Sequence, residues 1–125
     1  NTKENTITIS EGGNSCGYVN FITSKFWSGG HCYSIEELED DVFNIFLFHN
    51  LKHNQSLIMQ LRVGSGLPNI QKGGINNFKI QVPNFDEQIH IANFLSSIDN
   101  KIEQIVKQLD ETKQFKKALL QQMFV

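Results

Sequence analysis

A repeat of apolar side chains at alternating spacings of four and three residues runs through the last third of this 125-residue chain. An average spacing of 3.5 residues keeps one stripe of a helix facing a partner helix over several turns. The pattern therefore predicts a coiled-coil helix that pairs through this seam. Its apolar members are Ile91, Leu95, Ile98, Ile102, Ile105, Leu109, Leu119 and Met123.

The seam is too apolar to remain in water. Burying one large aliphatic side chain contributes roughly 1.5–3 kcal/mol, and six such residues lie between Ile91 and Leu109. Thr112 and Lys116 interrupt the seam, and polar residues at such positions can fix register or orientation. Further apolar residues lie outside the seam, at Ala92, Phe94, Val106, Phe115, Leu120 and Phe124. A second partner is therefore expected on this helix, beside the paired one.

Length and charge limit what the rest of the chain can be. One small globular domain and one long helix account for 125 residues. The formal net charge of -2 provides no global basic field, so contacts with nucleic acid would need a local patch of lysine and arginine. Neither a disulfide nor a zinc site is expected from Cys16 and Cys32, which form no CxxC pair. The start of the chain is polar and no apolar run approaches the roughly 20 residues of a membrane helix, which predicts a soluble, cytoplasmic protein.

The first half predicts a mixture of strands and helices. Ile7 and Ile9 alternate with threonines, and residues 18–22 form a second strand-like run after a glycine-rich turn. Apolar residues recur at helical spacing behind an acidic cluster, which predicts a helix over residues 36–52. The stretch 55–62 fits either a short helix or a buried strand.

The second half predicts a loop, a strand and the long helix. Residues 63–74 are dense in turn-forming types, and residues 78–82 alternate apolar and polar side chains as a strand does. Pro83 should end that strand, and Asn84 with Glu87 resembles a capping pair that opens a helix over residues 86–123. The expected fold is α+β, with a small mixed α/β domain over 1–85 and the long helix over 86–125.

Motifs typical of catalysis are absent from the sequence. It has no GxGxxG, P-loop, HExxH or nucleophile motif and no Asn-Pro-Pro-Tyr methylation motif. His31, His49, His53 and His90 are scattered, without the spacing of metal ligands. We therefore expect no catalytic residues, no metal site and no cofactor in this chain.

The segment from Val82 to Phe124 resembles the helical segment that closes each half of the DNA-specificity subunit of type I restriction-modification enzymes. The likeness rests on three features: a proline that ends a strand, an acid-glutamine pair, and lysine, leucine, leucine and glutamine near the end of the helix. The matching positions are Pro83, Glu87, Gln88, Ile91, Leu95, Asp99, Ile102, Lys117, Leu119, Leu120 and Phe124. The earlier part resembles the later portion of a target recognition domain, through NTITISEGGNSCGYVNF, FW, HCY and SGLPNIQKGGINNFKI.

The resemblance implies a non-catalytic subunit that reads double-stranded DNA. It implies modification subunits as direct partners, which bind S-adenosylmethionine and methylate DNA, and a restriction subunit as an indirect partner. A complete specificity subunit has two such units with antiparallel helices between two DNA half-sites. With one unit, this chain would restore the pair as a homodimer through the long helix and recognise a bipartite target.

One departure from the family leaves alternatives open. Its recognition domains usually carry several tens of residues before the segment that matches Asn5–Gly17, and these are missing here. The chain is then a half-subunit, a truncated gene product or an excised fragment, and the last is suggested by the lack of an initiating methionine. A truncated chain without DNA reading would act only as a scaffold for modification subunits.

Candidate DNA contacts lie in the expected loops. Phosphates call for lysine or arginine, base edges call for polar side chains, and glycines permit close backbone approach. The residues of these types are Asn14, Ser15, Lys25, Arg62, Lys72, Asn76, Asn77 and Lys79. Trp27 lies beside Lys25, and we expect it to anchor the core or the domain edge instead of stacking on a base.

Overall fold

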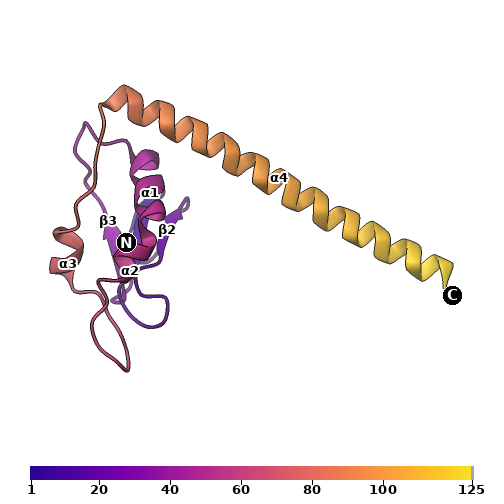
Figure 1. Ribbon diagram of the computed structural model, residues 1–125, viewed down its shortest axis with the longest axis horizontal. Coiled ribbons are helices and arrows are strands. Elements are labelled where there is room, and N and C mark those ends of the chain that lie inside the picture. The colour runs from indigo at the N-terminus through magenta and orange to yellow at the C-terminus, as the bar shows by residue number, and fades with distance from the viewer. Residues whose placement is uncertain (125) are drawn as a thin grey trace. The chain divides into compact units, whose positions relative to one another are not determined.

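The computed structural model describes residues 1–124, and Figure 1 shows its elements in chain order. Their bounds are β1 Thr6–Ser10, β2 Val19–Ile22, β3 Cys32–Ile35, α1 Asn44–His53, α2 Gln55–Met59, α3 Lys72–Asn76 and α4 Phe85–Met123. The chain divides into two compact units, of which the first ends at His90 and the second begins at Ile91. The α+β class expected from the sequence is confirmed.

The first unit is built on a three-stranded antiparallel sheet in the order β2-β1-β3. The alternation in β1 places Ile7 and Ile9 on one face, where both are buried, and Thr6 and Thr8 on the other. Ile9 pairs with Val19 of β2 and with Tyr33 of β3. The two strands predicted around residues 7–9 and 18–22 are thereby confirmed, whereas the short β3 was not predicted.

The core lies on the isoleucine face of the sheet. Leu47 and Leu51 of α1, Ile58 of α2 and Ile70 pack there with Ile7 and Ile9 in one buried cluster. Gly17 allows α2 to approach the sheet, because its φ is +92° and a Cβ at that position would lie 2.8 Å from the Met59 Cα atom. Cys16, which is buried beside it, and Cys32 are both free thiols.

The first predicted helix begins later than expected. Residues 36–43 precede α1 as turns and bends, and Glu37 has a φ of +54°, which a helix does not permit. Phe43 is extended and forms the N-cap of α1. The periodicity of Leu38 and Val42 was misleading, because both pack partly on the core without being helical.

The strand expected over residues 78–82 is also wrong. The segment is extended, with Phe78 and Ile80 packed on the core and Lys79 exposed, but it joins no sheet. Burial alone explains its alternation of apolar and polar residues. The open alternative at 55–62 resolves as the short helix α2, and the loop expected over 63–74 contains the start of α3.

The predicted start of the long helix is confirmed. The Asn84 side-chain oxygen accepts a hydrogen bond from the Glu87 backbone N–H at 2.9 Å, which is an N-cap contact. The helix α4 has 39 residues and is about 58 Å long at about 1.5 Å per residue. No helix among residues 1–124 is long and apolar enough to cross a membrane.

Candidate DNA interface and helix surface

Two glycine-rich loops, residues 11–17 and 63–70, lie side by side at one end of the first unit (Figure 1). The backbone N–H of Gly13 donates to the Pro68 carbonyl at 3.0 Å. The N–H of Ile70 donates to the Glu11 carbonyl at 2.8 Å. We call this pair of loops the double loop.

The double loop brings three of the predicted DNA contacts into one region. Asn14 and Ser15 are exposed in its first loop. Arg62 is exposed just before the second loop, and its Nε donates to the Met59 carbonyl at 2.8 Å. Burial raises the pKa of the Cys16 thiol, and the nearby Arg62 charge partly offsets this rise. Arg62 therefore lies close to the base of the first loop.

Two further predicted contacts lie on α3. The exposed Lys72 and Asn76 are four residues apart on this helix and so share one side of it. Because α3 begins two residues after Ile70, whose N–H bonds to Glu11, this helix leaves directly from the double loop. Asn77 follows as the C-cap of α3, and Lys79 is exposed two residues later. Arginine, lysine and amide groups suited to phosphate and base contacts thus occupy adjoining segments.

Lys25 belongs to a different part of the first unit. It lies in the crossover between β2 and β3, where the neighbouring Phe26 exchanges backbone hydrogen bonds with Thr2. Trp27 follows in the same crossover and is 80% exposed, so of the two expected places, the core and the domain edge, the core is wrong.

Sequence reasoning missed an exposed apolar residue of the double loop. Leu67 is 87% exposed between Gly66 and Pro68. The sequence could have indicated this exposure, because a leucine among turn-forming residues belongs to no helix or strand that would pack it into the core. An apolar side chain there is able to contact base methyl groups or wedge between base steps.

Lys52 has a structural role in the first unit. The Nζ atom of Lys52 donates to the Val19 carbonyl at 2.8 Å and to the Gln55 side-chain oxygen at 2.9 Å, and it lies 3.8 Å from the centre of the Tyr18 ring. This lysine joins α1 to β2 and α2.

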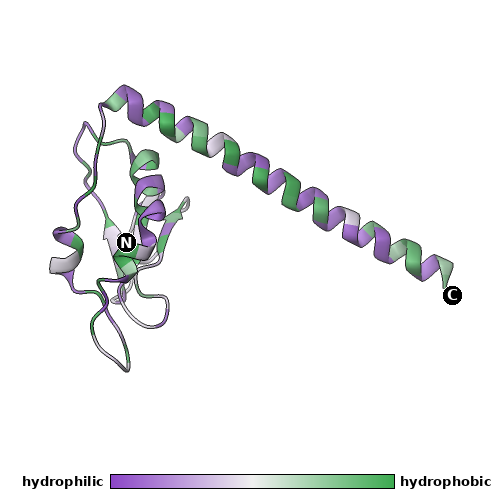
Figure 2. Ribbon diagram, viewed as in Figure 1, coloured by the Kyte–Doolittle hydropathy of each residue, from purple (hydrophilic) through white to green (hydrophobic). Residues whose placement is uncertain are grey.

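The predicted pairing seam lies along one side of α4. Figure 2 shows apolar residues recurring along the length of the helix. Ile98, Ile102, Ile105 and Leu109 expose between 41% and 54% of their surface. Leu119 and Met123 continue the stripe at its far end and are also exposed. Ile91 and Leu95 precede these residues and are partly buried.

A second group of exposed apolar residues borders the seam of α4. Its members are Phe94, Val106, Phe115, Leu120 and Phe124. A monomeric soluble protein rarely exposes a continuous apolar surface of this extent, and such surfaces mark interaction sites. Exposed apolar side chains of α4 therefore extend beyond the seam on both of its sides.

Nothing in the described part of the chain resembles a metal centre. No group of three or more histidine, cysteine or acidic residues among residues 1–124 lies close enough to hold an ion.

Comparison with known proteins relates both parts of the chain to one family. Residues 1–114 match the type I restriction modification DNA specificity domain. The type I restriction enzyme MjaVIII specificity subunit of Methanocaldococcus jannaschii is 30% identical to this chain over 121 residues, which are 97% of the chain and 28% of that protein.

A solved structure has the same fold. The crystal structure of the type I restriction-modification system S subunit from M. genitalium matches with a TM-score of 0.76 and 30% identity, over 86% of this chain and 29% of that one. The chain thus spans less than a third of the length of either relative. With the match extending from the first strand to the second half of α4, this chain belongs to the type I restriction modification DNA specificity domain family.

Proposed function

We propose that this chain is a non-catalytic DNA-recognition unit of the specificity-subunit type, either a half-subunit or a fragment of a longer one. The first unit reads one half of a bipartite double-stranded DNA target with the double loop and α3. Arg62, Lys72 and Lys79 contact phosphates, and Asn14, Ser15, Asn76 and Asn77 are the nearby polar groups for base edges. The family and the exposure of all these side chains support this assignment.

Pairing of α4 with the α4 of a second copy would supply the other half of the target. A two-fold axis between the copies makes the two half-sites identical in sequence and opposite in direction. The exposed seam of α4 is the single observation that carries this proposal. Each aliphatic residue removed from water would stabilise the pair by about 1.5–3 kcal/mol before the costs of association.

The second apolar group of α4 would receive the modification subunit. Phe94, Phe115 and Phe124 are large exposed aromatic residues, a type enriched in protein interfaces. In this arrangement the modification subunit binds S-adenosylmethionine and performs methyl transfer, and the restriction subunit joins through it. This chain contributes DNA recognition and assembly.

The test is an assembly experiment with the modification subunit from the same source. Size exclusion with light scattering would measure the mass of the chain alone and in the mixture. Fluorescence anisotropy would then measure binding of the mixture to a randomised DNA pool, followed by selection and sequencing of the bound DNA. We expect a dimer, a stable mixed complex and a selected sequence made of two inverted half-sites.

The outcomes separate recognition from assembly. A monomer that ignores the modification subunit would overturn the whole proposal. A stable mixed complex that selects no DNA sequence would leave only the scaffold role. A selected sequence without inverted symmetry would overturn pairing with a second copy while retaining DNA recognition.

A further inference from the structure

The segment between α2 and α3 contains a short hairpin that holds Leu67 near its tip. The Val63 N–H donates to the Asn69 carbonyl at 2.8 Å, and the Asn69 N–H donates to the Val63 carbonyl at 3.0 Å. Residues 64–68 lie between this pair, and Gly64 has a φ of +98° that allows the chain to turn. Figure 1 shows this segment extending away from the sheet.

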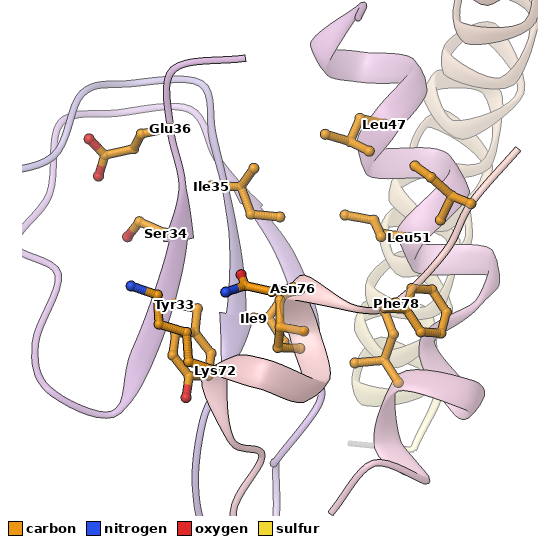
Figure 3. Close-up of a pocket in the computed structure, with 13 residues that line it drawn as sticks. Ile9, Tyr33, Ser34, Ile35, Glu36, Leu47, Leu51, Lys72, Asn76 and Phe78 are labelled. Carbon is orange, nitrogen blue, oxygen red and sulfur yellow. The ribbon is translucent and has the colours of Figure 1, made fainter. Parts of the chain in front are cut away.

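Hydrogen bonds fix the hairpin to two other parts of the first unit. The Gly13 N–H of the first loop donates to the Pro68 carbonyl at 3.0 Å. The Tyr33 hydroxyl of β3 donates to the carbonyl of the fully buried Ile70 at 2.8 Å. Figure 3 shows Tyr33 and Lys72, at the start of α3, lining one cavity. The hairpin therefore has a rigid base.

The backbone at Leu67 is restricted as well. A proline limits the residue before it to extended conformations, and Pro68 follows Leu67 directly. The Leu67 side chain is 87% exposed and has Gly66, which has no side chain, on its other side. A preorganised loop loses little conformational entropy on binding, so an apolar contact made by Leu67 would contribute most of its free energy to affinity.

The charge and width of the hairpin favour the major groove of DNA. Residues 12–17 and 63–70 contain no acidic side chain that would repel phosphates, and the exposed Arg62 precedes the hairpin. The major groove is about 12 Å wide and admits a two-stranded ribbon, whereas the minor groove is about 6 Å wide. Two paired strands are about 4.8 Å apart before their side chains are counted, so the hairpin is too wide for the minor groove.

We propose that Leu67 contacts the 5-methyl group of a thymine in the major groove and so makes that base pair part of the recognised half-site. This inference rests on the proposed function and deepens it, because it assigns one base contact within the double loop. Thymine is the base that displays a methyl group in the major groove. The alternative for Leu67 is a wedge between base steps, but such wedges belong to proteins that bind the minor groove.

Two randomised duplex pools provide the probe. They are identical except that one contains uracil in place of thymine, which removes only the 5-methyl group. DNA is selected from each pool with the chain assembled with its modification subunit, and again with Leu67→Ala and Leu57→Ala. Leu57 is 48% exposed on α2, outside the double loop, so its variant removes the same atoms elsewhere.

The selected sequences should depend on the leucine and the methyl group together. The unchanged chain and Leu57→Ala should select thymine at one position of the half-site, and this preference should weaken in the uracil pool. Leu67→Ala should show the weaker preference in both pools. All other positions should stay the same.

Single duplexes give the size of the effect by fluorescence anisotropy. Uracil at the assigned position should weaken binding of the unchanged chain about fourfold, because one methyl group is no longer buried. Leu67→Ala should bind the thymine and uracil duplexes equally, and Leu67→Met should restore the difference because it keeps an apolar side chain of similar length. The same loss with uracil in Leu67→Ala and in the unchanged chain would overturn the proposal.

The remaining outcomes separate this inference from the proposed function. A selected sequence with no thymine position that responds to Leu67→Ala would overturn the inference alone, and no selected sequence in either pool would overturn both. Weaker binding of Leu67→Ala to every duplex, with no effect of uracil, would assign Leu67 as a wedge. Thermal unfolding of Leu67→Ala should match that of the unchanged chain, and a loss typical of a core leucine would place Leu67 in a packed protein contact and overturn the proposal.

Discussion

The side-chain oxygen of Gln88 accepts a hydrogen bond from the Phe43 backbone N–H at 2.8 Å, although the two residues are 45 positions apart. The Gln88 amide group also donates to the Asp41 carbonyl at 2.8 Å and to the Pro83 carbonyl at 2.9 Å. Gln88 is only 1% exposed, and it ties the first turn of α4 to the segment that precedes α1.

Replacing Gln88 with leucine should therefore destabilise the first unit. The change leaves three backbone groups without their partner, and each unsatisfied buried group costs about 1–3 kcal/mol, so we expect a loss of at least about 3 kcal/mol. Urea unfolding followed by near-ultraviolet circular dichroism measures it. The control is Glu87→Gln at the exposed neighbour. Equal stabilities of the two variants would show that the three hydrogen bonds contribute nothing net.

Gly17 and Gly13 form a second matched pair. Both have a positive φ, but a Cβ would meet the Met59 backbone at Gly17 and nothing within 4 Å at Gly13. Gly13→Ala should cost only the backbone strain, about 1 kcal/mol, whereas Gly17→Ala should cost at least about 2–3 kcal/mol. Thermal unfolding of the two variants checks this order. Similar losses would mean that α2 moves away from the sheet without penalty.

Elements with a strong local signal were predictable from the sequence. The apolar seam and the Asn84 cap predicted the long helix, and the alternating isoleucines predicted β1. The start of α1 was not predictable, because Leu38 and Val42 have helical spacing but pack from a segment with Glu37 in a left-handed conformation. Tertiary burial produced the same periodicity there as a helix does.

The candidate site was predictable in residue type but not in arrangement. Glycine, asparagine and lysine in predicted loops indicated the segments, and all eight proposed side chains are exposed. That the loop containing Asn14 lies beside the loop that follows Arg62 depends on the pairing of Gly12 with Asn69, which are 57 residues apart. Local spacing carries no information about such long-range contacts. For the same reason, the hydrogen bond between Gln88 and Phe43 could not be predicted from the sequence.

Stability should fall at alkaline pH through one buried group, the Cys16 thiol, and one partly buried group, the Tyr33 hydroxyl. Burial raises the pKa of the Cys16 thiol above its ordinary value of 9.0, and burial together with the Glu11 charge raises the pKa of the Tyr33 hydroxyl above 10.0. The unfolded chain then releases these protons at lower pH than the folded chain. The contribution is fully present below about pH 9 and is lost as pH rises above the unfolded pKa values.

The variant Cys16→Ala with Tyr33→Phe isolates this effect. It removes both titrating groups, so its free energy of unfolding should decline less steeply between pH 9 and 11 than that of the unchanged chain. Urea midpoints at several pH values measure the two slopes. The variant loses the hydrogen bond from the Tyr33 hydroxyl to the Ile70 carbonyl, which lowers its stability at every pH and leaves the comparison of slopes valid. Identical slopes would refute the prediction.

Replacing Lys72 and Lys79 with glutamine should weaken DNA binding and its dependence on salt. Each phosphate contact contributes about 0.9 to the slope of log K against log salt concentration, so the slope should fall by up to about two units. Anisotropy titrations at several salt concentrations measure it. The control is Lys113→Gln with Lys117→Gln, which removes the same charge from α4. An equal change in both double variants would mean that only net charge matters.

The last prediction concerns Ile102, which is 53% exposed at the middle of the seam. Ile102→Asp would place a charge in the paired interface of each copy, and each copy would lose the roughly 1.5–3 kcal/mol that burial of the isoleucine contributes. We expect sedimentation to change from dimer to monomer while near-ultraviolet dichroism of the first unit stays the same. Asn100→Asp adds the same charge to α4 outside the seam and should leave the dimer intact. A dimer that persists in Ile102→Asp would show that another surface joins the copies, and equal dissociation of both variants would show that helix charge, not seam burial, controls association.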